Sequence, residues 1–221
     1  IVAAANGNGL GVCGTAGGTG NGDGVRMMSC QIFKGGMSTL DASAIGFVYA
    51  ADNGASIAQC SFGYEGEGAA YKSDLEYSKI FGAEYDAIAY FMDPENNNSE
   101  VLDGNIVIAA SGNDARNMSS YPAAVKDVIS VTALGPDYLP AATYTNYGPG
   151  CNIAAPGGDF YLGNYSSYAV NKSRVLSTFI NTVKSDENAS AQFDYDYAYM
   201  QGTSQACPHV SGVAALGLSY A

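Results

Sequence analysis

Residues 202–212 read Gly-Thr-Ser-Gln-Ala-Cys-Pro-His-Val-Ser-Gly and lead directly into the apolar run Val213 to Leu216. This pattern predicts a glycine turn followed by a helix, with Ser204 at the helix N-terminus and Pro208 in the first turn, where a missing N–H costs little. Backbone N–H groups at a helix N-terminus lack intrahelical partners and lie in a positive field. A serine hydroxyl there suits nucleophilic acyl transfer, because negative charge accumulates on a nearby oxygen during that reaction.

A second informative stretch lies upstream. Residues 105–113 read Asn-Ile-Val-Ile-Ala-Ala-Ser-Gly-Asn, which predicts a buried strand that ends at Ser-Gly-Asn. Tyr-Pro-Ala-Ala follows at residues 121–124, and a further apolar strand is expected at 128–133. Taken alone, Asn113 reads as a common turn residue. In chain order with the serine stretch it is a candidate functional amide.

These two motifs resemble the oxyanion and serine motifs of the subtilisin-like serine proteases, the subtilases. The resemblance implies that Ser204 attacks a peptide carbonyl and that the Asn113 side-chain amide stabilises the resulting oxyanion. Loss of one such donor typically costs about 3–4 kcal/mol of transition-state stabilisation. It also implies a polypeptide substrate and a reaction that requires no cofactor.

Two further segments look like the substrate-binding strands of that family. The resemblance implies that the backbone of Ser61, Phe62 and Gly63 pairs with an extended substrate. It implies that Ala110, Ser111 and Gly112 form a wall of the primary specificity pocket. By spacing alone, residues 61–63 read equally well as a strand end and a turn.

The chain departs from the family pattern in its histidines. His209 is the only one, and it lies five residues beyond Ser204. On a helix that separation is about 500° of rotation, roughly 140° away from the serine's face, so His209 is expected to be structural rather than the general base. Residues 1–14 look like the continuation of the helix that carries the family's catalytic histidine. We therefore interpret residues 1–221 as a single partial domain, truncated at both ends, with the triad His and Asp upstream. This chain alone is expected not to react with fluorophosphonates.

Three alternatives stay open on the sequence. The first is a catalytically inactive subtilase-like domain that binds peptides. The second is the acid-active sedolisin group, whose oxyanion donor is an aspartate, so Asn113 speaks against it. The third is a dinucleotide site, because residues 9–14 match G-x-G-x-x-G. That site needs a helix at its glycines, and residues 15–24 are too rich in glycine to form one.

Composition limits the partners. The formal net charge of −12 argues against nucleic acid and anionic membranes, and no apolar run is long enough to span a bilayer. By analogy with the family, we expect an exported protein that is secreted, periplasmic or on the cell surface. The resemblance also allows a structural calcium ion near Asn6 and Asn8, although few carboxylates are present there to hold one.

The cysteine count is odd, and no Cys-x-x-Cys spacing occurs, which argues against a metal site or a full disulfide framework. The sequence favours small buried side chains for all of them. The cysteines are Cys13, Cys30, Cys60, Cys151 and Cys207.

The expected elements alternate between strands and helices. Strands are predicted over 25–33, 55–62, 105–110, 128–133, 151–155 and 174–179, and helices over 39–52, 70–92 and the C-terminal end. Apolar strands that alternate with helices indicate a three-layer α/β/α fold with a mostly parallel sheet, as in subtilisin. The polar stretch 181–196 is expected to form a hairpin or loop, with Tyr197 and Tyr199 shaping the substrate cleft.

Overall fold

The computed structural model describes residues 1–34, 38–39, 41–64, 66, 71–141, 143–160, 173–182 and 193–221. Its central sheet has four parallel strands in the order β1-β2-β3-β4. These are β1 (Ile57–Cys60), β2 (Ile106–Ala110), β3 (Ile129–Leu134) and β4 (Ile153–Pro156). The described helices are α1 (Ala42–Asp52), α2 (Asp74–Ile80), α3 (Gly82–Met92), the 3₁₀ turn η2 (Pro94–Asn96) and α5 (Thr203–Tyr220).

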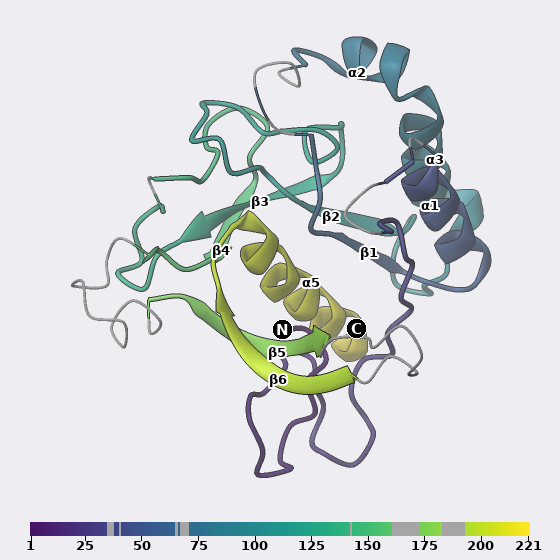
Figure 1. The fold of residues 1–221 in the computed structure, drawn as a ribbon. Coiled ribbons are helices and arrows are strands. Elements are labelled where there is room, and N and C mark those ends of the chain that lie inside the picture. Colours follow the sequence, from purple (N-terminus) through teal and green to yellow (C-terminus); the bar gives the residue numbers. More distant parts are fainter. Residues whose placement is uncertain are drawn as a thin grey trace, which may run out of the picture.

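Helices cover both faces of this sheet, and strand β2 shows why. Successive side chains of a strand point to opposite faces. Val107 and Ala109 pack into a core with α1 and α3, whereas Ile108 and Ala110 pack into a second core with α5. Every residue of β2 after Ile106 is buried, as expected for a central parallel strand. Figure 1 shows α1 and α3 on one side of the sheet and α5 crossing the other. The predicted three-layer α/β/α fold is confirmed.

A two-stranded antiparallel hairpin lies apart from the main sheet. It consists of β5 (Val175–Thr182) and β6 (Phe193–Met200). The strand predicted at 174–179 therefore exists, but it belongs to this hairpin. In Figure 1 the hairpin curves beneath α5, beside the N-terminal segment. The N-terminal ammonium of Ile1 donates to the Ser177 hydroxyl at 3.0 Å, which attaches the first residues to β5.

Three predicted elements are wrong. The single helix expected over 70–92 is interrupted: α2 ends before Phe81, and α3 begins at Gly82. Phe81 leaves the helical region (φ −114°, ψ 44°), and its ring packs on Tyr64, 3.9 Å away between centroids, so packing against a residue outside the helix overrides the helical pattern. Residues 25–33 form no strand, and residues 1–5 form no helix.

The glycine-rich segment at residues 9–14 also forms no helix. Gly9 and Gly11 have φ values of +71° and +56°, in the left-handed region that a right-handed helix does not use. A pyrophosphate site of the dinucleotide-binding type needs a helix N-terminus at this point. The structure therefore excludes that alternative.

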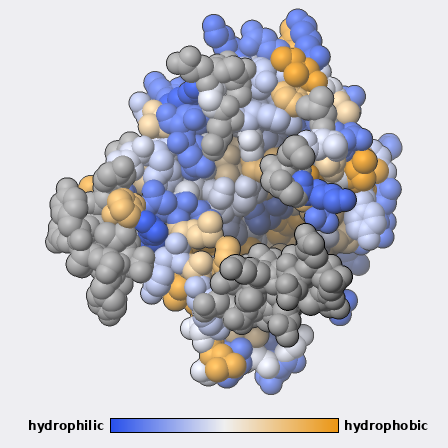
Figure 2. Space-filling model, viewed as in Figure 1, coloured by the Kyte–Doolittle hydropathy of each residue, from blue (hydrophilic) through white to orange (hydrophobic). Residues whose placement is uncertain are grey.

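Polar residues cover most of the described surface on the face shown in Figure 2, and hydrophobic ones lie in small separate patches. No helix in the described part of the chain is both long enough and apolar enough to cross a bilayer.

Candidate functional site

The carboxyl ends of the parallel strands meet the N-terminus of α5. Ser61 directly follows β1, and residues 111–113 directly follow β2. After β4, the carbonyl of Gly157 accepts a hydrogen bond of 3.0 Å from the N–H of Gly202, the residue before α5. Ligands of open parallel sheets bind at this edge, so the fold places the candidate residues where a site is expected.

The N-terminus of α5 is capped by a side chain from another element. Gly202 precedes the helix with φ +143° and has no side chain to cap it. Instead, the Asn113 Oδ1 accepts hydrogen bonds from the backbone N–H of Thr203 at 2.9 Å and from its hydroxyl at 3.0 Å. Only an oxygen can accept both, so the Asn113 amide nitrogen lies on the other arm of the carboxamide. Asn113 and the serine turn are therefore brought together.

Ser204 is the second residue of α5 and is half-buried. Its hydroxyl donates to the backbone carbonyl of Ser61 at 3.2 Å, and the Ser61 hydroxyl donates to the backbone carbonyl of Ser204 at 2.7 Å. Two hydrogen bonds in opposite directions thus join the end of β1 to the first turn of α5.

Pro208 explains why the Ser204 carbonyl can accept from the Ser61 hydroxyl, and its position differs from the predicted first turn. It lies inside α5 rather than in the first turn. Residue 208 would normally donate its N–H to the carbonyl of residue 204, but proline has none. The Ser204 carbonyl is therefore left for the Ser61 hydroxyl.

His209 lies on the same helix, where the sequence expected it. Its ring Nδ1 is 2.9 Å from the backbone carbonyl of Gln205. Burial lowers the pKa of this imidazole below its usual value, because charging it there would cost solvation. The ring is engaged with its own helix backbone.

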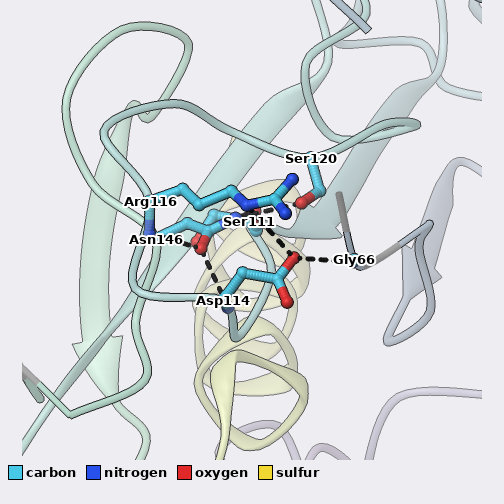
Figure 3. Close-up of polar contacts among 6 residues, drawn as sticks. All are labelled: Gly66, Ser111, Asp114, Arg116, Ser120 and Asn146. Carbon is cyan, nitrogen blue, oxygen red and sulfur yellow. Dashed lines mark hydrogen bonds and ion pairs between the residues drawn. The ribbon is translucent and has the colours of Figure 1, made fainter. Parts of the chain in front are cut away.

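The loop after β2 is organised by Asn146, which the sequence reasoning did not identify (Figure 3). This fully buried side chain accepts from the backbone N–H groups of Asp114 and Arg116 at 3.0 and 3.1 Å, and it donates to the Ser111 carbonyl and the Ser120 hydroxyl at 2.9 and 3.0 Å. All four hydrogen-bonding positions of the amide are used. Residues 144–147 read Tyr-Thr-Asn-Tyr, and the polar residues between two aromatic ones are the sequence feature that could have pointed to a buried Asn146.

An acidic group sits beside this loop. The Asp114 carboxylate accepts from the backbone N–H of Gly66 at 3.1 Å and lies 4.0 Å from the Arg116 Nε. Figure 3 shows this carboxylate between the loop and the segment that contains Gly66. Asp114 therefore links the loop after β2 to the chain that follows β1.

The segment after β1 is fixed at Tyr64. Its backbone N–H donates to the Tyr121 carbonyl at 2.9 Å, and its hydroxyl donates to the Glu84 carboxylate at 2.9 Å. The Tyr77 hydroxyl donates to the same carboxylate oxygen. Burial, followed by the negative charge of Glu84, raises the pKa of both tyrosines well above the usual value. Residues 61–63 thus lie between two anchors, one at α5 and one at Glu84.

Ser204 and Ser61 also line a cavity of about 480 Å³ between the hairpin, the N-terminal segment and α5. Strand β6 contributes Ala198 and Met200 to its lining, whereas Tyr197 and Tyr199 take no part; β5 contributes Val175, Ser177, Thr178 and Phe179. Gly11 packs so closely on the Tyr197 ring that a Cβ there would overlap it. The role of Tyr197 and Tyr199 in shaping the substrate cleft stays a prediction. Among the described residues, Asn113 also does not line this cavity.

The cysteines form no common site, and all are free thiols. Cys60 and Cys207 are buried as predicted, Cys30 and Cys151 are half-buried, and Cys13 is exposed, so the prediction of buried side chains fails for Cys13. Cys151 lies just before β4, not within it. In the described residues, no group of three or more His, Cys, Asp or Glu side chains could hold a metal ion.

Known proteins are similar to this chain in sequence and in fold. The model of the Subtilase family matches residues 1–221. A thermophilic serine proteinase of Bacillus sp. (strain AK1) is 29% identical over 217 residues, which are 98% of this chain and 40% of that protein. An extracellular protease of Xanthomonas campestris pv. campestris is 38% identical over 125 residues, 56% of this chain and 18% of that one.

The solved structures agree. A protease from Pseudoalteromonas arctica PAMC 21717 superposes with a TM-score of 0.70 at 27% identity, covering 97% of this chain and 55% of that one. The chain therefore spans about half the length of this structure, and 40% of the Bacillus proteinase.

Proposed function

Since the chain belongs to the subtilase family, we propose that it carries the nucleophile and the oxyanion donor of a serine endopeptidase. One observation supports this most directly. The Asn113 side chain caps the helix at Thr203, the residue before Ser204, so a candidate amide donor and a candidate nucleophile are held by the same helix turn.

In the proposed reaction the Ser204 Oγ forms a bond to the carbonyl carbon of the scissile peptide, and its proton passes to a general base. The base returns the proton to the leaving amine as the C–N bond breaks, and water then releases the acyl group by the reverse sequence. The Asn113 amide nitrogen and the N-terminal field of α5 stabilise the oxyanion in both halves.

The base and its orienting carboxylate are assigned to polypeptide outside residues 1–221. The one histidine of this chain is bonded to the Gln205 carbonyl on its own helix, and it therefore does not serve Ser204. Residues 1–221 alone should then fail to react with a fluorophosphonate.

Substrate binding is assigned to the two segments after β1 and β2. Strand β1 is an edge strand of the described sheet, and Ser61 and Gly63 extend it with exposed residues. An extended peptide can add to such an edge through main-chain hydrogen bonds, while Phe62 contributes an apolar contact. Residues 110–112 would face the bound side chain from β2. The substrates are therefore polypeptides, and the site selects only weakly among their sequences.

The test uses the full-length gene product that contains this chain. A fluorophosphonate probe should label Ser204, as located by mass spectrometry of the tryptic peptide, and Ser204→Ala should abolish both labelling and peptide hydrolysis. Peptide binding without labelling would instead favour an inactive peptide-binding domain. An activity maximum near pH 4 would favour the sedolisin alternative.

A structural calcium ion near Asn6 is part of the proposal. The buried Asn6 Oδ1 has no hydrogen-bond partner, while its amide nitrogen donates to the carbonyls of Gly14 and Gly18 at 3.2 and 2.9 Å. An orphaned side-chain oxygen in a glycine-rich loop suits Ca²⁺, which takes six to eight oxygen ligands. The Asn8 Oδ1 accepts a hydrogen bond from the backbone N–H of Leu10 instead. Calcium should raise the unfolding temperature of the full-length protein, and Asn6→Ala should remove that increase.

We also propose export from the cell. Several relatives are named as extracellular proteases, and the acidic surface suits a protein that avoids nucleic acid and anionic membranes. Fractionation of the source cells, with the protein found in the medium, tests this assignment.

A further inference from the structure

A polar side chain occupies an apolar position of strand β1. Ala58 and Cys60 belong to the core beneath α1 and α3, and Ile57 packs into the core beneath α5. By alternation, Gln59 therefore faces α5, where it is half-buried. A glutamine at this position needs partners for its amide, because burying an unpaired amide is costly.

The Gln59 amide nitrogen has two acceptors. It donates to the Ser61 Oγ at 2.7 Å and to the Cys207 Sγ at 3.6 Å. Burial raises the pKa of the Cys207 thiol to about 11, so this sulfur is a neutral thiol at pH 7. The short bond to the Ser61 hydroxyl is thus the strong one of the two.

That bond fixes where the Ser61 proton points. A serine hydroxyl has one proton to donate and lone pairs that accept. Because Gln59 donates to the Ser61 oxygen, the single Ser61 proton is available for the Ser204 carbonyl, which it meets at 2.7 Å. Pro208 supplies no competing N–H for that carbonyl. The result is a chain of hydrogen bonds from Gln59 through Ser61 to the backbone of Ser204.

We propose that Gln59 is a positioning residue for the nucleophile, acting through the Ser61 hydroxyl. This inference rests on the proposed role of Ser204. In residues 1–221 two bonds join Ser61 and Ser204, one of them donated by the Ser204 hydroxyl, whose single proton turns to the general base when that group is present. In the acyl-enzyme the Ser204 oxygen carries the acyl group and has no proton, so that bond is lost. The bond directed by Gln59 is then the one that keeps the serine turn in register with β1.

The experiment compares variants of the full-length protein. Gln59→Met keeps the length of the side chain and removes its donor. Gln59→Glu at pH 8 keeps the shape and presents only acceptors, so the Ser61 proton turns away from Ser204. Gln31→Met is the matched control, because the exposed Gln31 donates to the Phe33 carbonyl at 3.0 Å and, among the described residues, bonds neither Ser61 nor Ser204. For each variant, kcat, KM, fluorophosphonate labelling rate and unfolding midpoint are measured.

We expect both Gln59 variants to lower kcat and the labelling rate by about tenfold, with KM changed less than about twofold. The control should match the parent. A double-mutant cycle with Ser61→Ala separates positioning from packing: the double variant should be no slower than the slower single variant, because both substitutions break the same chain.

Equal kcat and labelling rates in the parent and both Gln59 variants would overturn the proposal. So would losses that multiply in the double variant, or a loss confined to KM or to the unfolding midpoint. These outcomes leave Ser204 labelling in the parent intact and are thereby distinct from failure of the proposed function. A parent protein whose Ser204 does not label would overturn both.

Discussion

The Asn113 Oδ1 accepts both the backbone N–H and the hydroxyl of Thr203, at 2.9 and 3.0 Å. The same side chain thus caps α5 with its oxygen and, in the proposed function, serves the oxyanion with its nitrogen. Structural and catalytic roles fall on different atoms of one amide, so substitution can separate them.

Asn113→Asp keeps an acceptor for Thr203 and removes the donor. We expect kcat/KM to fall by about 10²–10³, with stability close to that of the parent, because a carboxylate also suits a helix N-terminus. Asn113→Ala should lose the same activity and, in addition, about 1 kcal/mol of stability, since the cap is gone. Steady-state kinetics and urea unfolding check both. Equal stability of the two variants would contradict the capping role.

Gly112 is a second position where backbone geometry serves the site. Its φ is +108°, and a Cβ would lie 2.4 Å from both the Asn146 Nδ2 and the Ser120 Oγ. Gly112→Ala should therefore destabilise the protein by more than the roughly 1 kcal/mol expected for positive φ alone, and it should lower kcat by moving Asn113. Gly54→Ala is the matched control, because its φ is +90° and a Cβ there meets nothing within 4 Å. Similar losses in the two variants would exclude the steric argument.

The sequence predicted the layers and placed the candidate residues at one edge of the sheet, because both follow from strand periodicity and from motif order. It did not predict the contacts that hold the site. Asn146 and Gln59 look like ordinary polar residues in the sequence, and their importance comes from partners 30 and 148 residues away. The sequence did not predict the helix break at Phe81 for the same reason, because the Phe81 ring packs on Tyr64, which lies outside the helix. Long-range packing and hydrogen bonding decide these features, and local patterns do not encode them.

His209 gives stability a dependence on pH. Burial lowers the pKa of the folded-state imidazole below the value of about 6.5 expected when the chain is unfolded. As the pH falls through about 6.5, the unfolded state therefore binds the proton first, and stability decreases. His209→Gln should show a smaller loss of urea midpoint between pH 7.5 and 5.5 than the parent. Because carboxylates contribute equally to both proteins, an identical slope in the two would refute this role of His209.

Thiol accessibility provides a direct check of the packing. Cys13 is exposed, whereas Cys60 and Cys207 are buried, and burial raises the pKa of both buried thiols. Under native conditions at pH 8, a maleimide should modify Cys13 first and should reach Cys60 and Cys207 only after unfolding. Peptide mapping at successive times identifies each site. Early modification of Cys207 would mean that the start of α5 is not packed against β1 as described.

Glu84 connects the proposed substrate-binding segment to the core beneath α1 and α3. It is fully buried, its Oε2 accepts from Tyr64 and Tyr77, and its Oε1 has no partner. Glu84→Leu leaves two tyrosine hydroxyls without their acceptor and should cost about 2–4 kcal/mol of unfolding free energy. Glu84→Gln keeps one acceptor oxygen for both hydroxyls and should cost less.

The expected effect of Glu84→Leu on kinetics follows from the position of Tyr64, directly after residues 61–63. If Glu84 holds that segment, Glu84→Leu should raise KM for peptide substrates more than it lowers kcat, because the proposed binding edge loosens while the Ser61–Ser204 bonds remain. The exposed Glu95 offers the control, and Glu95→Leu should change neither parameter. A Glu84→Leu enzyme that is destabilised but has the parent KM would show that Glu84 supports the core alone and that the binding edge is fixed at Ser61.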